Sequence, residues 1–349
     1  MTDRLPAGCL ELLALQHGVI SRRQALDGGM SVTQIRGRLR GERWQPLYRG
    51  VYAAFTGEPT RPALIWSALL SAGPEAAVSH DTAAELYELG LTKAEAIHVT
   101  IPAARTVQRD ARPVPALVSS GRKVTLPRLV VHRSDRIIRA RHPVLLPPRT
   151  RVEETVIDLT QSAATFEGAF DWLCQACASR RCTTEMLRRA LDQRKKVRYR
   201  QELRAALADI ADGVHSQLEY RYVHGVERPH GLPAARRQAL MTPGSRRRYL
   251  DNLYQDYLLA VELDGTASHP AAGRWRDINR DRSLARLGIM TLRYNWSDVT
   301  TRRCQIAAEI ADILAQRGWP RTLRPCSPAA RPRDHDRGDL MPHSTPNPP

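Results

Sequence analysis

Two helix starts of the same design follow one another near the N-terminus, and they constrain the fold of this chain more than any other feature. Ser21 precedes Gln24 by three residues, as Ser31 precedes Gln34. This S-x-x-Q spacing is a capping box, in which the serine and the glutamine close the first turn of a helix reciprocally. Gly41 ends the second helix, and the stretch RWQPLYRGVYAAF that follows is typical of a β-hairpin. Two short helices followed by a small ribbon predict a winged helix-turn-helix.

We place this unit at residues 5–56, with a first helix in CLELLALQHG that Gly18 ends. In the second capped helix Val32, Ile35 and Leu39 recur at helical spacing and form the buried stripe. The outward residues of that helix and the arginines of the ribbon are then candidate DNA contacts: Thr33, Gln34, Arg36, Arg38, Arg40, Arg43 and Arg49. The alternative is a scaffold or dimerisation module whose arginines are simply solvated.

The charge of the chain agrees with a polyanionic partner. Lys and Arg number 53 against 36 Asp and Glu, a formal net charge of +17 at pH 7. This excess favours nucleic acid, with an anionic membrane surface as a weaker option and an arginine-rich genome as the bland explanation. No stretch approaches the roughly 18–20 apolar residues of a membrane span, and the N-terminus has no secretory signal. We expect a cytoplasmic protein without a membrane partner.

Residues 60–205 predict architecture rather than chemistry. Helix and strand patterns alternate in this region and indicate a mixed α/β connector, which ends in a run of helices up to about residue 211. His80, His98 and His132 are far apart in sequence, and two of them lie in strand-like segments. We therefore interpret the three as core or edge histidines rather than metal ligands.

Two further segments carry no predicted chemistry. Cys174 and Cys177 have metal-like spacing but no second pair at zinc-site distance, which favours a buried helical thiol pair over zinc or redox chemistry. Residues 321–349 are rich in Pro, Arg, Asp and Ser with almost no apolar side chain. Such a segment cannot bury enough surface to offset its chain entropy, and it predicts a disordered tail.

An acidic strand near the C-terminus requires a positive partner. Side chains alternate along LLAVELDG, so Glu262 and Asp264 share one face of the strand. If the preceding turn is centred between Asp256 and Tyr257, Asp251 lies directly opposite Glu262. Three carboxylates on one face suit a hard cation such as Mg²⁺. The alternative is neutralisation by arginines that are near in sequence, namely Arg276, Arg280 and Arg293.

Residues on either side of this strand supply further candidates. His269 is placed to act as a general base or to position a water, because a neutral imidazole titrates in the useful range. Asp277 and Arg280 lie on a predicted helix behind it, where they would orient ligands or clamp a phosphate. Ser216 precedes Glu219 at the capping-box spacing, so Glu219 is either a helix cap or a site residue.

The order of these residues resembles a known nuclease group. S-x-x-E, a strand aspartate, VELDG with a following histidine, and RDxxRDxxLxxLG together resemble domain-of-unknown-function family 559, a relative of the very-short-patch-repair endonucleases in the PD-(D/E)xK superfamily. The resemblance covers residues 212–318. It implies a catalytic set of Glu219, Asp251, Glu262, Asp264 and His269, with Mg²⁺ held by Asp251, Glu262 and Asp264. Asp264 stands where many members of the superfamily carry lysine.

The first part of the chain resembles a second group. HGVISRRQAL, GERWQPLYRGVYAA and SHDTAAEL are similar to the N-terminal region of AbiEi-type antitoxins, which are DNA-binding repressors. We therefore expect an α+β multidomain protein with a winged helix-turn-helix, a mixed α/β middle region and a restriction-endonuclease-like PD-(D/E)xK core. The leading hypothesis is a DNA-binding protein with a Mg²⁺-dependent endonuclease domain. The alternative is a repressor or antitoxin with a cognate toxin and a non-catalytic C-terminal domain.

Overall fold

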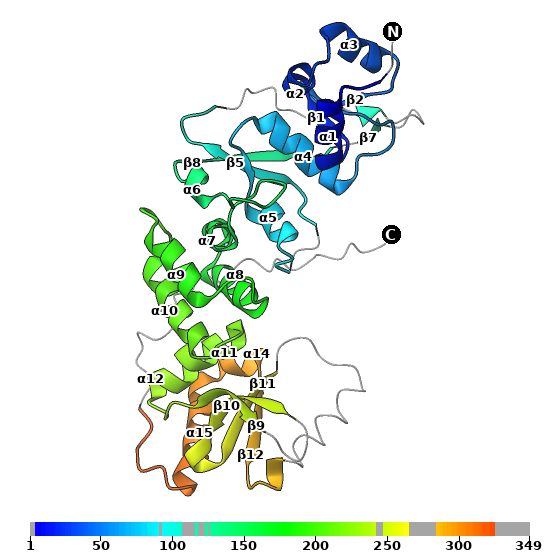
Figure 1. The fold of residues 1–349 in the computed structure, drawn as a ribbon. Helices are drawn as coiled ribbons and strands as arrows, with labels where there is room; N and C mark the ends of the chain where they lie inside the picture. Colours follow the sequence, from blue (N-terminus) through cyan, green and yellow to red (C-terminus); the bar gives the residue numbers. More distant parts are fainter. Residues whose placement is uncertain are drawn as a thin grey trace, which may run out of the picture. The chain divides into compact units, whose positions relative to one another are not determined.

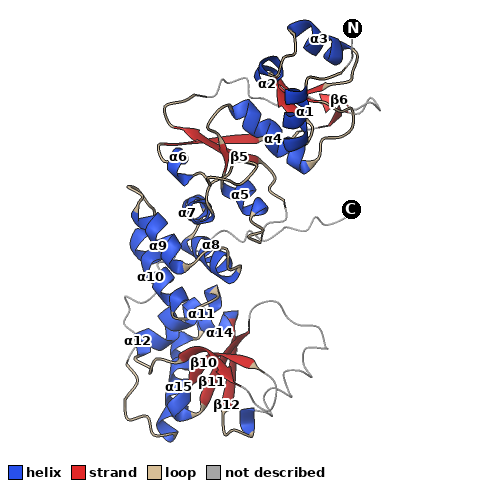
Figure 2. Cartoon of the chain, viewed as in Figure 1, coloured by secondary structure: helices blue, strands red, loops and turns tan. Residues whose placement is uncertain are grey.

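The chain folds into two units, each a mixture of helices and sheets (Figures 1 and 2). They are divided between Ile210 and Ala211 in the computed structural model. The residues that it describes are 4–90, 93–106, 116–117, 123–124, 126–241, 247–264 and 284–324. His269, Asp277, Arg280 and residues 325–349 of the predicted tail lie outside this part of the chain. No helix in the described part is long and apolar enough to cross a membrane.

The first unit begins with two capped helices and a three-stranded sheet. Its elements are α1 (Ala7–Leu15), β1 (Val19–Ser21), α2 (Arg22–Asp27), α3 (Val32–Arg40), β2 (Gln45–Tyr48) and β3 (Val51–Ala53). Both predicted capping boxes are present, with Ser21 and Gln24 on α2 and Ser31 and Gln34 on α3. The predicted hairpin pairs β2 with β3 in antiparallel fashion. Sequence reasoning missed β1, which pairs with β3 on the other side, and extended α1 beyond its actual end.

Two hydrophobic clusters hold this region together. Cys9, Ile20, Ile35 and Trp44 belong to a small core beneath α1, α2 and α3. A larger cluster joins Leu47, Tyr48 and Val51 of the ribbon to residues of α4 (Arg61–Ala72) and of the strand β5 (Ile97–Pro102). The predicted boundary between residues 56 and 60 therefore falls within one continuous core.

The rest of the first unit contains a second small sheet followed by helices. Its elements are α4 (Arg61–Ala72), β4 (Ala77–Val78), α5 (His80–Leu86), β5 (Ile97–Pro102), β6 (Ala116–Leu117), β7 (Lys123–Val124), β8 (Leu129–Ser134), α6 (Ile137–Ala140), α7 (Val152–Ser162), α8 (Phe166–Ala178), α9 (Thr184–Asp192) and α10 (Arg200–Ala211). The sheet order is β4-β5-β8, with β4 antiparallel and β8 parallel to β5. Thr60 caps α4, and Gly73 ends that helix at a φ of 86°, a conformation that glycine adopts without strain.

Residues 188–204, RRALDQRKKVRYRQELR, form a strongly basic run that covers the end of α9 and the start of α10, and several of its arginines bind groups within the first unit. Arg194 binds Glu154 and Asp158 at 2.8 and 2.6 Å, with little of the three side chains exposed. Other arginines of the run bind carboxylates: Arg188 and Arg189 bind Glu185, and Arg204 binds Asp192. Cys174 and Cys177 lie on α8, as expected of a helical pair, and burial raises the pKa of Cys177 to about 11.

The second unit is one mixed sheet with helices at both ends of its sequence. Its elements are α11 (Gln217–Tyr222), the π-helical turn η1 (Val223–Glu227), α12 (Arg228–His230), β9 (Arg236–Met241), β10 (Arg248–Tyr254), the 3-10 turn η2 (Gln255–Tyr257), β11 (Leu259–Asp264), β12 (Met290–Asn295), α14 (Trp296–Thr301) and α15 (Arg303–Gln316). The strand order is β12-β11-β10-β9. Strands β9, β10 and β11 are antiparallel neighbours, and β12 runs parallel to β11.

The two faces of this sheet bury different partners. Leu259 and Val261 pack with α11 and α15, whereas Ala260 packs with Leu253 and Ile289. The stretch DVTTRRCQIAAEIADILAQRG predicts a single helix from near Asp298 to Gly318, but the structure has two, because the chain turns at Arg302 between α14 and α15. Alternation along β11 sets Glu262 on the face of Ala260, opposite the face that α11 and α15 cover.

Candidate functional site

The exposed side of α3 carries the first candidate site. Ile35 is buried in the small core at 2% exposure, while Thr33, Gln34 and Arg40 are exposed and Arg38 is half-buried. The guanidinium of Arg38 lies over the ring of buried Trp44, 5.9 Å from its centroid. This contact positions the arginine against a rigid aromatic surface.

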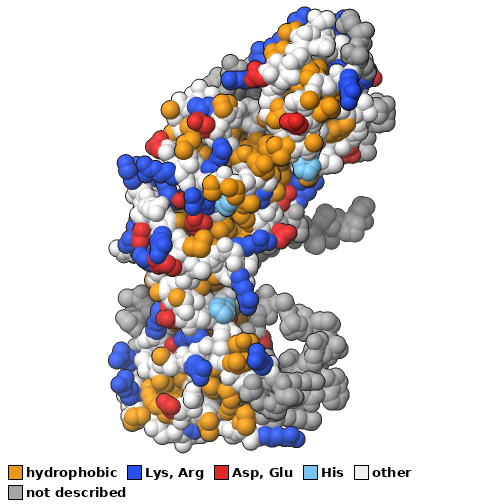
Figure 3. Space-filling model, viewed as in Figure 1, with side chains coloured by type: hydrophobic (Ala, Val, Ile, Leu, Met, Phe, Trp, Pro, Cys, Tyr) orange, Lys and Arg blue, Asp and Glu red, His pale blue; other side chains and the backbone are white. Residues whose placement is uncertain are grey.

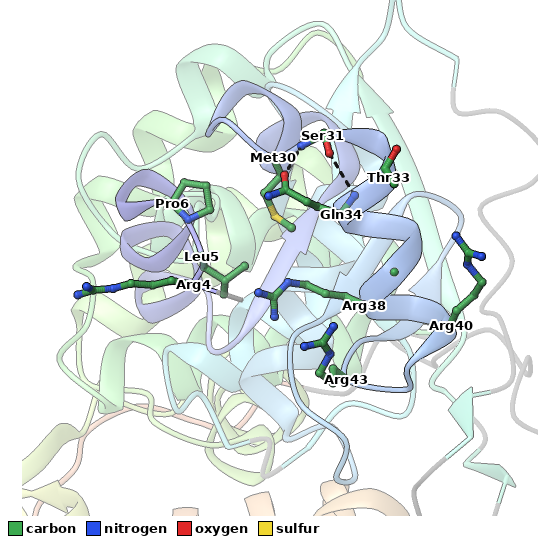
Figure 4. Close-up of a pocket in the computed structure, with 11 residues that line it drawn as sticks. Arg4, Leu5, Pro6, Met30, Ser31, Thr33, Gln34, Arg38, Arg40 and Arg43 are labelled. Atoms are coloured by element: carbon green, nitrogen blue, oxygen red, sulfur yellow. Dashed lines mark hydrogen bonds between the residues drawn. The ribbon is translucent and has the colours of Figure 1, made fainter. Parts of the chain in front are cut away.

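Thr33, Gln34, Arg38 and Arg40 line a hollow of about 790 Å³ (Figure 4). Five of the seven predicted DNA contacts belong to its lining, namely Thr33, Gln34, Arg38, Arg40 and Arg43. In the view of Figure 4 Arg38 and Arg43 extend on the same side of α3, and Arg40 points away from them. Two guanidinium groups on one side of a hollow create a local positive potential that suits an anion.

Two of the predicted contacts lie outside the hollow, and six residues of its lining were not among the predicted contacts. Arg36 and Arg49 are exposed but do not line the hollow. The segment before α1 contributes to the lining instead, through Arg4, Leu5 and Pro6. No periodicity or motif marks these residues in the sequence, so only the fold could bring them to α3.

Gln34 has a structural role that limits its use as a contact. Its Oε1 accepts a hydrogen bond from the backbone N–H of Ser31 at 2.7 Å, and its own N–H donates to Ser31 Oγ at 3.2 Å. The dashed lines in Figure 4 show this reciprocal cap. Thr33, which is exposed in the first turn of α3, has no such role in the cap.

Basic side chains are not confined to this hollow. In the view of Figure 3 Lys and Arg are spread over both units, with Asp and Glu between them. The net charge of the chain therefore does not by itself locate an interface, and the geometry around α3 is the more specific signal.

The acidic residues of the second unit form the second candidate site. Strands β10 and β11 pair Asn252 with Val261 and Tyr254 with Leu259. These pairs are symmetric about the point between Asp256 and Tyr257, which confirms the predicted register. The same register places Asp251 across from Glu262, one residue beyond the last backbone pair of the ladder.

Asp251 is held between its two neighbouring strands. The N–H of Leu263 on β11 donates to Asp251 Oδ2 at 2.9 Å, and Gln238 Nε2 on β9 donates to Asp251 Oδ1 at 3.3 Å. Gln238 has a φ of 43°, and the pairing of β9 with β10 skips the Gln238–Asp251 position. A left-handed non-glycine residue of this kind costs roughly 1–3 kcal/mol and is frequent at functional sites.

Glu219 lies close to this carboxylate. Gln238 Nε2 is 3.5 Å from Glu219 Oε2, so one amide contacts both acids. The Glu219 side chain accepts from the His215 N–H at 2.9 Å and from the Ser216 hydroxyl at 3.1 Å, which closes the start of α11. Burial raises the pKa of Glu219, and the charge of Asp251 acts in the same direction. Glu219 is thus both a helix cap and a neighbour of Asp251.

The last two acids of the strand differ in environment. Glu262 is buried, with 3% of its surface exposed. The Asp264 side chain is 58% exposed and binds Arg293 on β12 at 3.4 Å, one of the arginines named from the sequence. The alternative of neutralisation by arginine is therefore realised at Asp264.

A compact set of three acids is not formed by the described residues. The one set of three His, Cys, Asp or Glu side chains in the described chain whose ligand atoms all lie within 4.8 Å is His80, His98 and His132. Asp251 and Glu262 remain as two acids at facing register positions of β10 and β11. Mg²⁺ usually takes only one or two protein carboxylates and keeps several waters, so the chemistry of two acids suits that ion. The predicted His269, Asp277 and Arg280 lie outside the described residues.

Comparison with known proteins adds no assignment to these sites. No model of a known protein family matches the chain. Curated proteins likewise give no significant match.

Proposed function

We propose that this chain binds DNA through an N-terminal winged helix-turn-helix, with α3 as the helix that enters the major groove. The observation that carries the proposal is the hollow along α3, which Arg38 and Arg43 line from one side. Two capped helices followed by a β-ribbon form the element order that such modules use.

The side chains of α3 divide into two kinds of contact. Arg38, Arg40 and Arg43 suit phosphate oxygens, which set affinity and its salt dependence. Thr33 lies in the first turn of α3, and the N-terminal residues of a recognition helix are those that reach base edges. Arg4 extends from the segment before α1, where an arm would reach the adjacent groove.

The test is a titration of labelled duplex DNA with the full chain at several salt concentrations. We expect the double variant Arg38→Ala/Arg43→Ala to bind more weakly and to lose about one unit of salt slope per phosphate contact removed. Arg189→Ala is the matched control, because this arginine on α9 is 70% exposed and far from the hollow in sequence. Equal affinity and equal salt slope in all three proteins would overturn the proposal.

A second function is favoured by the opposed pair Asp251 and Glu262. On the resemblance to the very-short-patch-repair nucleases, we propose that these two side chains hold Mg²⁺ in a restriction-endonuclease-like core. The bound ion would supply a polarised water and neutralise charge on a phosphodiester. Gln238 fixes the Asp251 carboxylate, and Glu219 lies beside it as a further acid.

Metal-dependent nicking of supercoiled plasmid tests this second function. Asp251→Asn and Glu262→Gln should abolish nicking, because both changes remove a charge and preserve shape. Asp256→Asn, on the exposed turn of the same hairpin, should nick like the unmodified chain. Asp264→Asn should retain part of the activity, because its carboxylate binds Arg293. Nicking that survives in both pair variants would assign the activity elsewhere.

These two experiments, together with a footprint at the chain's own promoter, separate the nuclease from a repressor or antitoxin. Binding without cleavage by the unmodified chain, with a footprint at its own promoter that Arg36→Ala and Arg38→Ala remove, would favour the non-catalytic alternative. A cognate toxin would then be the expected protein partner. Cleavage that requires Asp251 and Glu262 would exclude it.

A further inference from the structure

Three histidines of the first unit meet on one side of the small sheet. His98 lies on β5, His132 on the parallel strand β8, and His80 is the first residue of α5. One ring nitrogen from each of the three histidines lies within 4.8 Å of those of the other two. Sequence reasoning interpreted them as separate core or edge residues, because separations of this length carry no metal-site signature. The pairing of β5 with β8 brings them together.

The orientation of His98 is that of a metal ligand with a supporting carboxylate. Its Nδ1 lies 3.0 Å from Nε2 of His132, and its Nε2 lies 3.5 Å from Asp81 Oδ2. Histidines that bind metals commonly donate their other ring N–H to a carboxylate, which fixes the ring and makes the ligand nitrogen more basic. Nitrogens around a tetrahedral ion with bonds of about 2.0–2.1 Å are about 3.3 Å apart, so the 3.0 Å between His98 Nδ1 and His132 Nε2 would need to widen only slightly.

His80 is fixed on its other side. Its Nδ1 lies 3.0 Å from Ser79 Oγ, and buried Ser79 accepts in turn from the Thr100 hydroxyl at 2.7 Å. The His80 ring stacks on His132 with centroids 3.6 Å apart and planes 12° apart. A nitrogen lone pair lies in the ring plane, so two stacked rings cannot aim at one ion. Metal binding must therefore turn the His80 ring out of the stack.

The surroundings of the three imidazoles favour their neutral form. Burial, with the nearby histidines, lowers the pKa of His80 to about 3 and that of His132 to about 4. Burial also lowers the pKa of His98, while the charge of Asp81 raises it. Arg194 is the positive group that acts on His80, but Glu154 and Asp158 neutralise it.

We propose that His80, His98 and His132 form a binding site for a borderline divalent metal ion of the Zn²⁺ class, with water in the fourth position. Three imidazoles suit Zn²⁺ and its neighbours rather than Mg²⁺, which prefers oxygen. The site is distinct from the Asp251–Glu262 pair and does not depend on either proposed function. A bound ion would tie the start of α5 to β5 and β8.

The test uses the full chain stripped of metal and titrated with Co²⁺, whose visible absorption reports coordination geometry, followed by competition with Zn²⁺. We expect one equivalent of Co²⁺ with the intense bands of a four-coordinate ion, displaced by Zn²⁺ and unaffected by Mg²⁺. His98→Gln and His132→Gln should lose these bands. His17→Asn is the matched control, because this exposed histidine has a φ of 53°, which asparagine tolerates.

A second variant guards against a simple loss of folding. Asp81→Asn leaves all three ligands in place, and it should weaken Co²⁺ binding by about 10–100-fold through loss of the supporting carboxylate. Zn²⁺ should raise the melting temperature of the unmodified chain more than that of this variant. Absence of four-coordinate bands in the unmodified chain, or bands that persist in both histidine variants, would overturn the proposal. Bands lost in Asp251→Asn instead would assign the ion to the acidic site.

Discussion

Arg237 and Gln238 are neighbours on β9, but the first stabilises the second unit and the second contacts the acidic site. The Arg237 guanidinium forms a buried ion pair with Glu227 and also donates to Asn252, which in turn donates to the Val261 carbonyl at 3.2 Å. Gln238 has its backbone in a left-handed conformation and its amide on Asp251. One residue holds the unit together, and the next one builds the acidic site.

Arg237→Met should therefore destabilise the second unit strongly. The side chains of Arg237 and Glu227 are only 9% and 4% exposed, so the variant leaves a buried carboxylate without its cation. We expect a loss of about 3–5 kcal/mol in the free energy of unfolding, measured with urea. Arg236→Met, at an exposed position of the same strand, should change it by less than about 0.5 kcal/mol. Similar losses in both variants would contradict this account.

The buried Glu219 carboxyl should make stability depend on pH. Its pKa in the folded chain lies above the ordinary value, so the folded chain binds more protons than the unfolded chain between those two pKa values. The free energy of unfolding falls as pH rises through that window. We expect Glu219→Gln to lack this fall, so that the difference between variant and unmodified chain moves in favour of the variant as pH rises.

The same measurement has a direct control. Asp251→Asn removes one of the charges that raise the pKa of Glu219. In a chain that carries Asp251→Asn, the pH range over which the free energy of unfolding falls should therefore be narrower. An unchanged window would show that Asp251 does not act on Glu219, and the two acids would then not belong to one site.

Part of the acidic site around Asp251 could be predicted from the sequence. The register that sets Asp251 opposite Glu262 follows from the symmetry of the turn, and Arg293 was one of the expected partners of Asp264. Gln238 could not be identified, because neither its φ nor the skipped pair on β9 has a signal in the residue types around it. The three-histidine set depends on strand pairing, which the sequence does not specify.

At the scale of elements, the helix starts were the most predictable features. A capping box involves only four consecutive residues, so the sequence alone identifies it, as for α2 and α3. Strands β1 and β4 are too short to show an alternating pattern, and β9 was missed as well. Their existence depends on the partners that they pair with, which are tertiary contacts.

The cap of α3 connects stability with binding. Ser31→Ala removes the side chain that accepts from the Gln34 N–H, and it should lower the free energy of unfolding by about 1 kcal/mol. Ser31→Asp keeps a good capping oxygen and should retain stability. The aspartate adds a negative charge at the hollow that Ser31 lines, so it should weaken DNA binding more than the alanine does. The reverse order in either assay would contradict the assignment.

At the scale of the whole molecule, we predict which fragments of the chain fold alone. The chain divides between Ile210 and Ala211, whereas the ribbon shares its core with the elements that follow it. Residues 1–210 and 211–349 should each fold, because each unit has its own buried clusters. Residues 1–57 should not unfold cooperatively alone, because Leu47, Tyr48 and Val51 lose the side chains of α4 and β5 that cover them. Thermal unfolding followed by circular dichroism checks all three, and a sharp transition in the short fragment would contradict the shared core.

Strand β5 has two different faces. Ile97, Val99 and Ile101 belong to the core that supports the ribbon, while His98 alternates with them on the opposite face. An ion bound at His98 would therefore lie on the strand whose other face packs against the ribbon of β2 and β3. If the chain binds DNA as proposed, any factor by which the ion changes the affinity for DNA is also the factor by which DNA changes the affinity for the ion. The occupancy of the DNA site would then follow the supply of the metal.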